Sequence, residues 1–480
     1  MPQTTAYDAV VVGAGPNGLA AAITLAAAGQ AVLLVEANDT IGGSVRSAAL
    51  TQPGFVHDLG SAIHPLCLGS PFFRSMPLER YGLEWIQPDL PVAHPLDDGT
   101  AAFQHRSLAE TAATLGPDGP AYQRLMQPFV DHWEVLLGET LQPLLHIPRH
   151  PLLLARFGLQ AIRSAKGVAE AWFETERARA LFAGIAAHAT LPLEQMGSSA
   201  FGLVLGLLGH AVGWPMPKGG AQRITDALAA HFRALGGTIE TGRRITSLDD
   251  LPPAHAVLLD VTPRQLLHIA EDKLPLRYRR RLEDFRYGWS VFKVDYALHA
   301  SVPWQADAAH RAGTLHLGGT LDEIAAAERE VAAGRHPERP YVLVAQHSLF
   351  DDTRAPADQH TLWAYCHTPQ GSTFDMTDRI EQQIERFAPG FRDCILQRHV
   401  TTPAGLERSN ANLVEGTING GAMDLMQLLA RPVFGPVPYR TPLAGVYLCS
   451  SSTPPGGGVH GMCGLLAAKT ALRDLSSKVE

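Results

Sequence analysis

The chain has 480 residues, 46% of them hydrophobic and 18% charged, which is typical of a globular protein with a large core and not of a disordered chain. Its formal charge of -8 and isoelectric point near 6.2 provide no general positive field with which to hold nucleic acid or an acidic membrane surface, so nucleic acid is not an expected partner. Five cysteines in no metal-binding spacing and a polar amino-terminal segment predict a cytoplasmic chain with free thiols and no metal site.

The first predicted elements form a βαβ unit that is typical of dinucleotide binding. An apolar strand at residues 9–12 is followed by three glycines in the spacing GxGxxG, namely Gly13, Gly15 and Gly18. The first glycine permits a tight turn, the second lets the backbone approach a diphosphate, and the third allows close packing of helix on strand. A second strand ends at Glu36, which we expect to accept hydrogen bonds from the adenosine ribose.

The residues after this unit indicate which dinucleotide is bound. Gly42, Gly43 and Arg46 follow Glu36, and this second glycine pair with an arginine is more than NAD binding requires. The pattern resembles flavoproteins that hold FAD inside the protein, in which the arginine neutralises phosphate charge. We therefore predict non-covalent FAD as the cofactor.

Several longer segments together resemble one family. They are the amino-terminal unit, PMPKGGAQRITDALAAHFRALGGTIETGRRITSL (215–248), YGWSVFKVDYALHASVPW (287–304) and RTPLAGVYLCSSSTPPGGGVHGM (440–462). With these segments, nearly the whole chain resembles the phytoene desaturase-like flavoproteins, and within them the branch of pyridine nucleotide-disulfide oxidoreductase domain-containing protein two and its bacterial relatives.

The resemblance implies an α/β fold, α+β overall, in which a Rossmann-like FAD-binding domain is assembled from separate segments. Residues 1–75, 215–265 and 436–480 are expected to form that domain. Residues 76–214, largely helical, and 266–435 are expected to form an inserted substrate domain with a mixed sheet and helices.

The resemblance also assigns roles to residues before the carboxyl terminus. The loop GFVHDLGSAIHPL (54–66) corresponds to one that passes over the flavin, which would place Gly60 and Ser61 against the cofactor and His64 near its reactive N5 atom. His64 is the first candidate for proton transfer, because an imidazole can serve as either acid or base. A strand over 238–245 is expected to bring the backbone of Ile245 to the adenine.

The carboxyl-terminal segment is expected to return to the same cofactor. A strand over 445–449 would lead into a glycine loop that contacts the ribityl chain and ring, followed by a helix from about Val459 whose positive end stabilises the reduced flavin. Related flavoproteins often carry an acidic residue here, whereas this chain has three serines from Ser450 onward. The expected contacts are Ser451, Ser452, Gly457, Gly458, Val459 and Met462, with His460 as the second catalytic candidate.

The inserted segments supply apolar walls but no further signature of a reaction. The run 200–214 is interrupted by His210 and is too short to span a bilayer. The expected function is FAD-dependent desaturation, saturation or isomerisation of carbon-carbon bonds in an apolar substrate, such as a polyene or isoprenoid. Peripheral contact of the protein with a membrane is compatible with this function. Two alternatives stay open: a flavin amine oxidase, and a flavoprotein with a mainly binding or assembly role. The sequence leaves the oligomeric state, the substrate and the electron acceptor undetermined.

Overall fold

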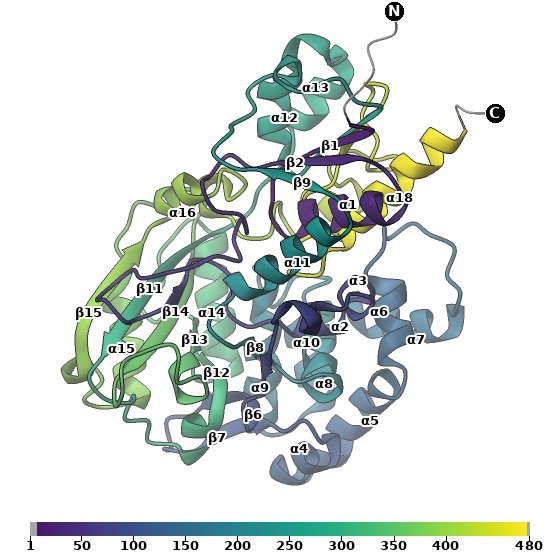
Figure 1. Cartoon of the computed structure of the whole chain (residues 1–480). Helices are drawn as coiled ribbons and strands as arrows, with labels where there is room; N and C mark the ends of the chain where they lie inside the picture. The colour runs from purple at the N-terminus through teal and green to yellow at the C-terminus, as the bar shows by residue number, and fades with distance from the viewer. Residues whose placement is uncertain (1–6, 478–480) are drawn as a thin grey trace, which may run out of the picture.

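The computed structural model describes residues 7–477. Its upper part in Figure 1 contains a parallel sheet built from three regions of the chain. Ala9 stands in register with Val32 on one side and Ala256 on the other. The strand order is β16 (Val446–Leu448), β10 (Ala256–Leu259), β1 (Ala9–Val12), β2 (Val32–Val35) and β9 (Thr238–Glu240).

Helices cover both faces of this sheet, which explains why its strands are apolar without alternation. Ala9 and Val11 belong to one core and Val10 and Val12 to another, since successive side chains point to opposite faces. The first face is covered by α1 (Pro16–Ala27), α11 (Gln222–Ala234) and α18 (Met462–Ser476), and the second by α12 (Pro263–Ala270) and α13 (Leu276–Glu283).

A larger mixed sheet lies below, at the lower left of Figure 1. Within it β6 and β12 are parallel and the other pairs are antiparallel. Phe292 and Val294 of β11 pack in one core with Ile384 of α15 (Thr377–Phe387). The strand order is β15 (Ile395–Thr401), β11 (Ser290–Leu298), β14 (His360–Thr368), β13 (Val342–Ala345), β12 (Ala312–Leu317), β6 (Leu90–Pro95) and β7 (Ala101–Gln104).

Helices fill the remaining side of the molecule, at the lower right of Figure 1. No helix formed by residues 7–477 is long and apolar enough to cross a membrane. These helices are α4 (Leu108–Thr114), α5 (Gly119–Val130), α6 (Trp133–Thr140), α7 (Pro151–Ala161), α8 (Ala165–Trp172), α9 (Glu176–Ala186) and α10 (Ser199–Ala211). The other helices are α2 (Pro65–Gly69), α3 (Pro71–Arg74), α14 (Leu321–Ala332), α16 (Pro403–Ser409) and α17 (Leu425–Leu429). Two short strand pairs complete the described fold: β3 (Ser47–Ala48) with β4 (His57–Asp58), and β5 (Trp85–Ile86) with β8 (Met216–Pro217).

The predicted fold class is confirmed, and two expected element limits are corrected. The strand expected over 238–245 ends at Glu240, where its pairing with β2 stops. The last helix begins at Met462 and not near Val459, because Gly458 and Gly461 have positive φ angles of 114° and 66° that a right-handed helix excludes. The expected domain limits stay a prediction.

Asp58, at the end of β4, connects segments that are far apart in the sequence. Its buried carboxylate accepts hydrogen bonds from Ser47 Oγ at 2.6 Å, the amide of Ala221 at 2.8 Å and Arg354 Nη2 at 2.8 Å. His347 Nε2 lies 3.4 Å away. Burial alone would raise the pKa of Asp58, but the Arg354 guanidinium and these donors hold it below its usual range. The loop that carries His64 is thereby tied to β3, to the start of α11 and to the segment between β13 and β14.

Replacing this carboxylate should destabilise the whole fold. Asp58→Asn leaves the fully buried Arg354 without its counter-charge, so we expect the free energy of unfolding in urea to fall by about 3–5 kcal/mol. The exposed Asp307→Asn should change it by less than about 0.5 kcal/mol. Because the pKa of Asp58 is lowered on folding, its contribution is present above pH 4 and lost as the pH falls. Equal stability of the two variants would contradict this role.

Candidate functional site

The predicted glycine turn is formed as expected at the carboxyl end of β1. Gly13 has a φ of 99° and its amide donates to Val35 O at 2.7 Å. A Cβ on Gly18 would lie 1.8 Å from Gly13 O, so α1 can pack this closely on the turn only with glycine there. Gly13 and Gly15 line a large cavity, whereas Gly18 serves the packing beneath it.

Glu36 organises the next part of the cavity wall. Its Oε2 accepts from the amide of Ala14 at 2.8 Å and its Oε1 from the amide of Asn38 at 2.9 Å. Glu36 also lines the cavity, together with Ile245. The structure therefore brings these two predicted residues together although the strand before Ile245 is shorter than expected.

The second glycine pair contributes less directly than expected. Gly43 lines the cavity, but Gly42 and Arg46 are not among its lining residues. The Arg46 guanidinium donates to Gly43 O at 2.9 Å and to Ser409 O at 2.6 Å, so this arginine ties the loop to the end of α16. This geometry supports an indirect role for Arg46, which fixes the position of Gly43 on the cavity wall.

His64 lies on the cavity wall with Gly60 and Ser61. It is buried, its Nδ1 is 3.5 Å from Ser61 Oγ, and its Nε2 has no hydrogen-bond partner among the described residues. Burial lowers the pKa of His64 to about 4, so the ring is neutral near pH 7. A buried nitrogen without a partner is suited to contact a bound molecule.

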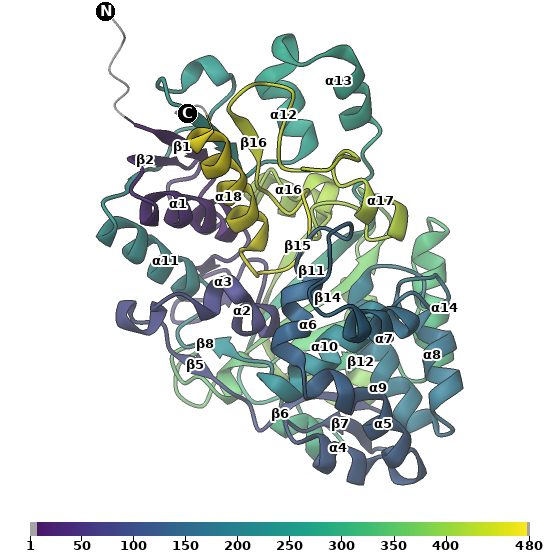
Figure 2. The same cartoon turned by 90° about the vertical axis from the view of Figure 1, so that its right-hand side faces the viewer.

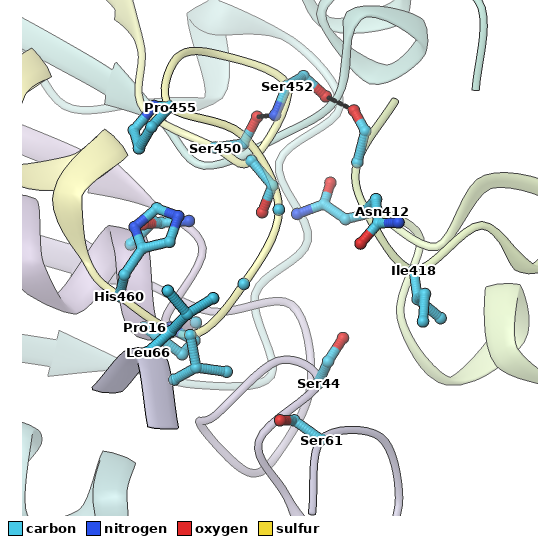
Figure 3. A pocket seen from close by; sticks show the side chains of 18 of the residues that line it. Pro16, Ser44, Ser61, Leu66, Asn412, Ile418, Ser450, Ser452, Pro455 and His460 are labelled. Carbon is cyan, nitrogen blue, oxygen red and sulfur yellow. Dashed lines mark hydrogen bonds between the residues drawn. The ribbon is translucent and has the colours of Figure 1, made fainter. Parts of the chain in front are cut away.

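The three serines after β16 differ in their surroundings. Ser450 Oγ donates to Val261 O at 2.7 Å and Ser452 Oγ donates to Gly420 O at 2.6 Å. Figure 3 shows Ser450 and Ser452 on one side of the pocket, across from Ser44 and Ser61. Ser451 also lines the cavity, and no hydrogen bond is recorded for its hydroxyl within residues 7–477. This leaves Ser451 as the serine with a hydroxyl available to a ligand.

The glycine loop before α18 contains the second histidine candidate. Gly457, Gly458 and Val459 line the cavity with His460, whereas Met462 does not. His460 Nδ1 accepts from the amide of Met462 at 3.0 Å, and His460 Nε2 lies 3.1 Å from Gly456 O. Both ring nitrogens are therefore engaged, and burial lowers the pKa of His460 to about 4. This arrangement favours a structural role in shaping the loop.

Sequence reasoning missed Lys293, a charged residue on the cavity wall. Lys293 is buried on β11 and pairs with Asp295, two residues away on the same face of the strand. It lines the cavity near the ring of Trp363, at 5.8 Å from the ring centroid. Burial lowers its pKa, and Asp295 opposes that effect. Two opposite charges at positions i and i+2 of an apolar strand were the signal available in the sequence.

Asp260 was also missed. It follows β10 directly and lines the cavity beside the glycine turn. Its position at the carboxyl end of a parallel strand was the available signal, because ligands of such sheets bind at that edge.

The cavity continues from this edge into an apolar chamber and has a volume of about 1170 Å³. Its lining includes Glu36, Asn38, the serines after β16 and the glycine loop. Figure 3 shows Pro16, Leu66 and His460 on one side of the pocket, with Asn412 and Ile418 on the other. The chamber beyond is lined by Phe157, Phe201, Leu205, Trp214, Leu343, Trp363 and Tyr365.

Comparisons with known proteins agree with this geometry. Residues 8–265 match the model of the FAD dependent oxidoreductase family. Pyridine nucleotide-disulfide oxidoreductase domain-containing protein 2 of Rattus norvegicus is 28% identical, over 98% of this chain and 94% of its own length. All-trans-zeta-carotene desaturase of Myxococcus xanthus is 24% identical, over 94% and 90%. A solved structure of putrescine oxidase bound to putrescine has a TM-score of 0.62 at 18% identity, over 98% of this chain and 99% of that one.

The described residues fit FAD. The cavity begins at the glycine turn and at the amino end of α1, where a diphosphate is favoured, and it continues past the serines and the glycine loop. Four of its lining residues, Asn17, His64, Thr314 and Trp363, carry buried polar atoms without a partner among the described residues. Such atoms need a ligand or water to complete their hydrogen bonds.

Glu36 provides a direct test of the cofactor site. Glu36→Ala removes the acceptor that we expect the ribose to use and frees the amides of Ala14 and Asn38, so FAD affinity should fall by roughly 1.5–3 kcal/mol, or about 10- to 150-fold. The exposed Asp39→Asn, three residues further on, serves as the control and should leave affinity unchanged. Flavin fluorescence during equilibrium dialysis measures both. Unchanged affinity in Glu36→Ala would remove Glu36 from the site.

Proposed function

We propose that this chain, which belongs to the FAD-dependent oxidoreductase family and binds FAD, acts on carbon-carbon bonds of an apolar substrate by desaturation, saturation or isomerisation. The observation that carries the proposal is the apolar chamber, which is continuous with the cofactor end of the cavity. Phe157, Phe201 and Leu205 offer such a substrate contacts but no polar partner. The related carotene desaturase, named for a polyene substrate, supports this substrate class.

Each part of the site has a role in this reaction. Bound FAD supplies an acceptor or donor for a hydride. The chamber walls orient the substrate and exclude water, which keeps competing proton exchange away from the reacting carbon. A proton must also leave or reach the substrate, and His64 and Lys293 are the buried titratable side chains on the wall whose surroundings suit that step.

His64 is our first choice for proton transfer and Lys293 the second. His64 Nε2 has no protein partner, and the neutral ring can accept a proton. Lys293 is held by Asp295, and burial favours its neutral form, so the pair can share a proton. The two residues belong to different segments of the chain, and both line the chamber side of the cavity.

A flavin amine oxidase is the second candidate function. Trp363 and Tyr365 favour it, because their rings lie 5.1 Å apart on the chamber wall and aromatic residues commonly frame an amine. A binding or assembly role would leave both classes of compound unchanged and bound FAD unreduced by either.

Anaerobic flavin reduction distinguishes the three functions. The purified holoprotein is mixed with apolar polyenes, isoprenoids and, separately, alkylamines, and the flavin absorbance is followed. Bleaching by an apolar compound supports desaturation, reoxidation of photoreduced flavin by such a compound supports saturation, and isomerisation of the compound without net bleaching supports isomerisation. Bleaching by amines alone supports the oxidase. Photoreduction followed by reoxidation with oxygen or a quinone tests the acceptor. Identifying an apolar compound that copurifies with the protein narrows the panel.

The same assay tests His64. His64→Ala should bind FAD normally but lose turnover by about 10²–10⁴-fold, because no group accepts the proton at that position. In the wild type, turnover should fall as the pH drops through about 4, where the ring becomes protonated, and the variant should lack that step. Lys293→Met is the matched comparison. Turnover that survives with reduced flavin content would make His64 a cofactor contact.

We also propose that the cavity opens toward an anionic membrane surface. Leu144, Leu159 and Ile162 line the cavity and are themselves exposed, so the opening lies at α7 and the loop before it. Figure 2 shows α7 on the side that faces the viewer. Further exposed apolar side chains on the same segments and near α17 are Leu145, Ile147, Leu152, Met196, Met426 and Leu429.

The charges around this opening suit the same partner. Residues 141–163 contain Arg149, Arg156 and Arg163 but no aspartate or glutamate, although the chain as a whole is acidic. The neighbouring segments are in contact, since the amide of Gly197 donates to Ile162 O at 2.9 Å and a Cβ on Gly197 would lie 3.1 Å from Leu425. Exposed apolar side chains flanked by cations are typical of interfacial segments.

Vesicle sedimentation tests this surface. The double variant Ile147→Asp, Leu152→Asp should bind vesicles with 30% phosphatidylglycerol about tenfold more weakly than the wild type, since two apolar contacts become charged. Leu276→Asp, at an exposed leucine on α13, is the control and should bind as the wild type does. Pure phosphatidylcholine vesicles should bind the wild type less well. Equal binding of all variants would exclude this surface.

A further inference from the structure

Asp260 places a carboxylate where the cofactor carries its own negative charge. Its Oδ2 accepts from the amide of Gly18 at 3.0 Å, in the first turn of α1. An ideal Cβ on Gly15 would lie 3.1 Å from the same oxygen, so the carboxylate borders on the part of the turn that lines the cavity. The positive end of α1 favours an anion, and both Asp260 and a diphosphate would occupy it.

The surroundings of Asp260 supply no counter-charge. Among the described residues, no cation lies within ion-pair distance of it. The ionisable groups that face it are Glu36 from the end of β2, the buried thiol of Cys449 after β16, and that of Cys463 in α18. Burial raises the pKa of Asp260 to about 7; the Gly18 amide opposes this rise and Glu36 adds to it. Near neutral pH the carboxyl is therefore close to half protonated.

We propose that Asp260 links cofactor binding to proton uptake, so that the protein binds FAD together with one proton from solvent. The proton forms an O–H bond on the Asp260 carboxylate, and no other bond forms or breaks. The neutral acid keeps one oxygen for the Gly18 amide and removes the repulsion between Asp260 and the diphosphate. Asp260 thus acts on cofactor binding and is not a catalytic residue.

The linkage fixes the direction of the pH dependence. FAD binding favours the protonated carboxyl, so the full affinity for FAD is present below pH 7. Above pH 7 the affinity is lost, and the Kd rises by at most tenfold per pH unit. His64 and His460, with pKa values near 4, stay neutral throughout this range and cannot produce the effect. The diphosphate diester of FAD is fully ionised in this range as well.

Equilibrium dialysis of the holoprotein at pH 6.0 and pH 8.5 tests the proposal. The wild-type Kd for FAD should rise about tenfold between the two values. Asp260→Asn keeps the size and an acceptor for Gly18 but cannot ionise, so its Kd should change less than about twofold. Asp8→Asn is the matched control. Asp8 precedes β1 at the opposite edge of the same sheet and accepts a hydrogen bond from the amide of Ala31. This variant should retain the wild-type pH response. A flat wild-type profile, or a wild-type slope in Asp260→Asn, would overturn the proposal.

Two further measurements keep the test decisive if Asp260→Asn fails to fold. Titration calorimetry of FAD into dialysed wild-type protein at pH 7.5, in two buffers with different ionisation enthalpies, should report uptake of roughly half a proton or more per FAD. No proton uptake would overturn the proposal. The Kd of ADP-ribose, whose diphosphate diester is fully ionised at both values, should rise between pH 6.0 and pH 8.5, whereas the Kd of adenosine should not change. The same pH dependence for adenosine would place the titrating group away from the diphosphate.

Discussion

The buried ion pair between Asp58 and Arg354 is the interaction on which the site depends. The two residues are 296 positions apart, and the same carboxylate also accepts from Ser47 and from the amide of Ala221. Because a buried carboxylate is costly without partners, all these segments must be in place together. The loop with His64 follows directly, so this group ties the start of that loop to β3, to the start of α11 and to the segment between β13 and β14.

The two ends of the chain meet at the carboxyl edge of the parallel sheet. β1 contributes the glycine turn, β10 contributes Asp260, and β16 leads into the serines and the glycine loop. Figure 1 shows the purple and yellow segments side by side there, with α1 packed on α18. Parallel strands bring all their carboxyl ends to one edge, and residues more than 400 positions apart therefore line one cavity.

Burial sets the chemistry of the cavity wall. It lowers the pKa values of His64 and His460 to about 4 and also lowers the pKa of Lys293. Neutral side chains suit a site for an apolar substrate, because a charge there would hold water. Asp260 follows the same rule, since burial favours its protonated form at the place where the cofactor brings negative charge.

The sequence by itself determined the features that depend on neighbouring residues. The glycine spacing, the apolar strands and Glu36 predicted the βαβ unit, and the resemblance of the whole chain to one family predicted the second, mixed sheet and the FAD-binding fold. The limits of strand 238–240 and of α18 were predicted less well, because sheet pairing and positive φ angles at glycines end an element where the apolar pattern continues.

Only the tertiary structure decided which side chains reach the cavity. Arg46 donates to Ser409, His460 has both ring nitrogens engaged by its own loop, and Lys293 reaches the cavity wall from β11. Asp260 meets Gly18 across 242 residues of sequence. A residue type shows what chemistry a side chain can perform, but its partners, burial and charge state are set by segments that come together only on folding.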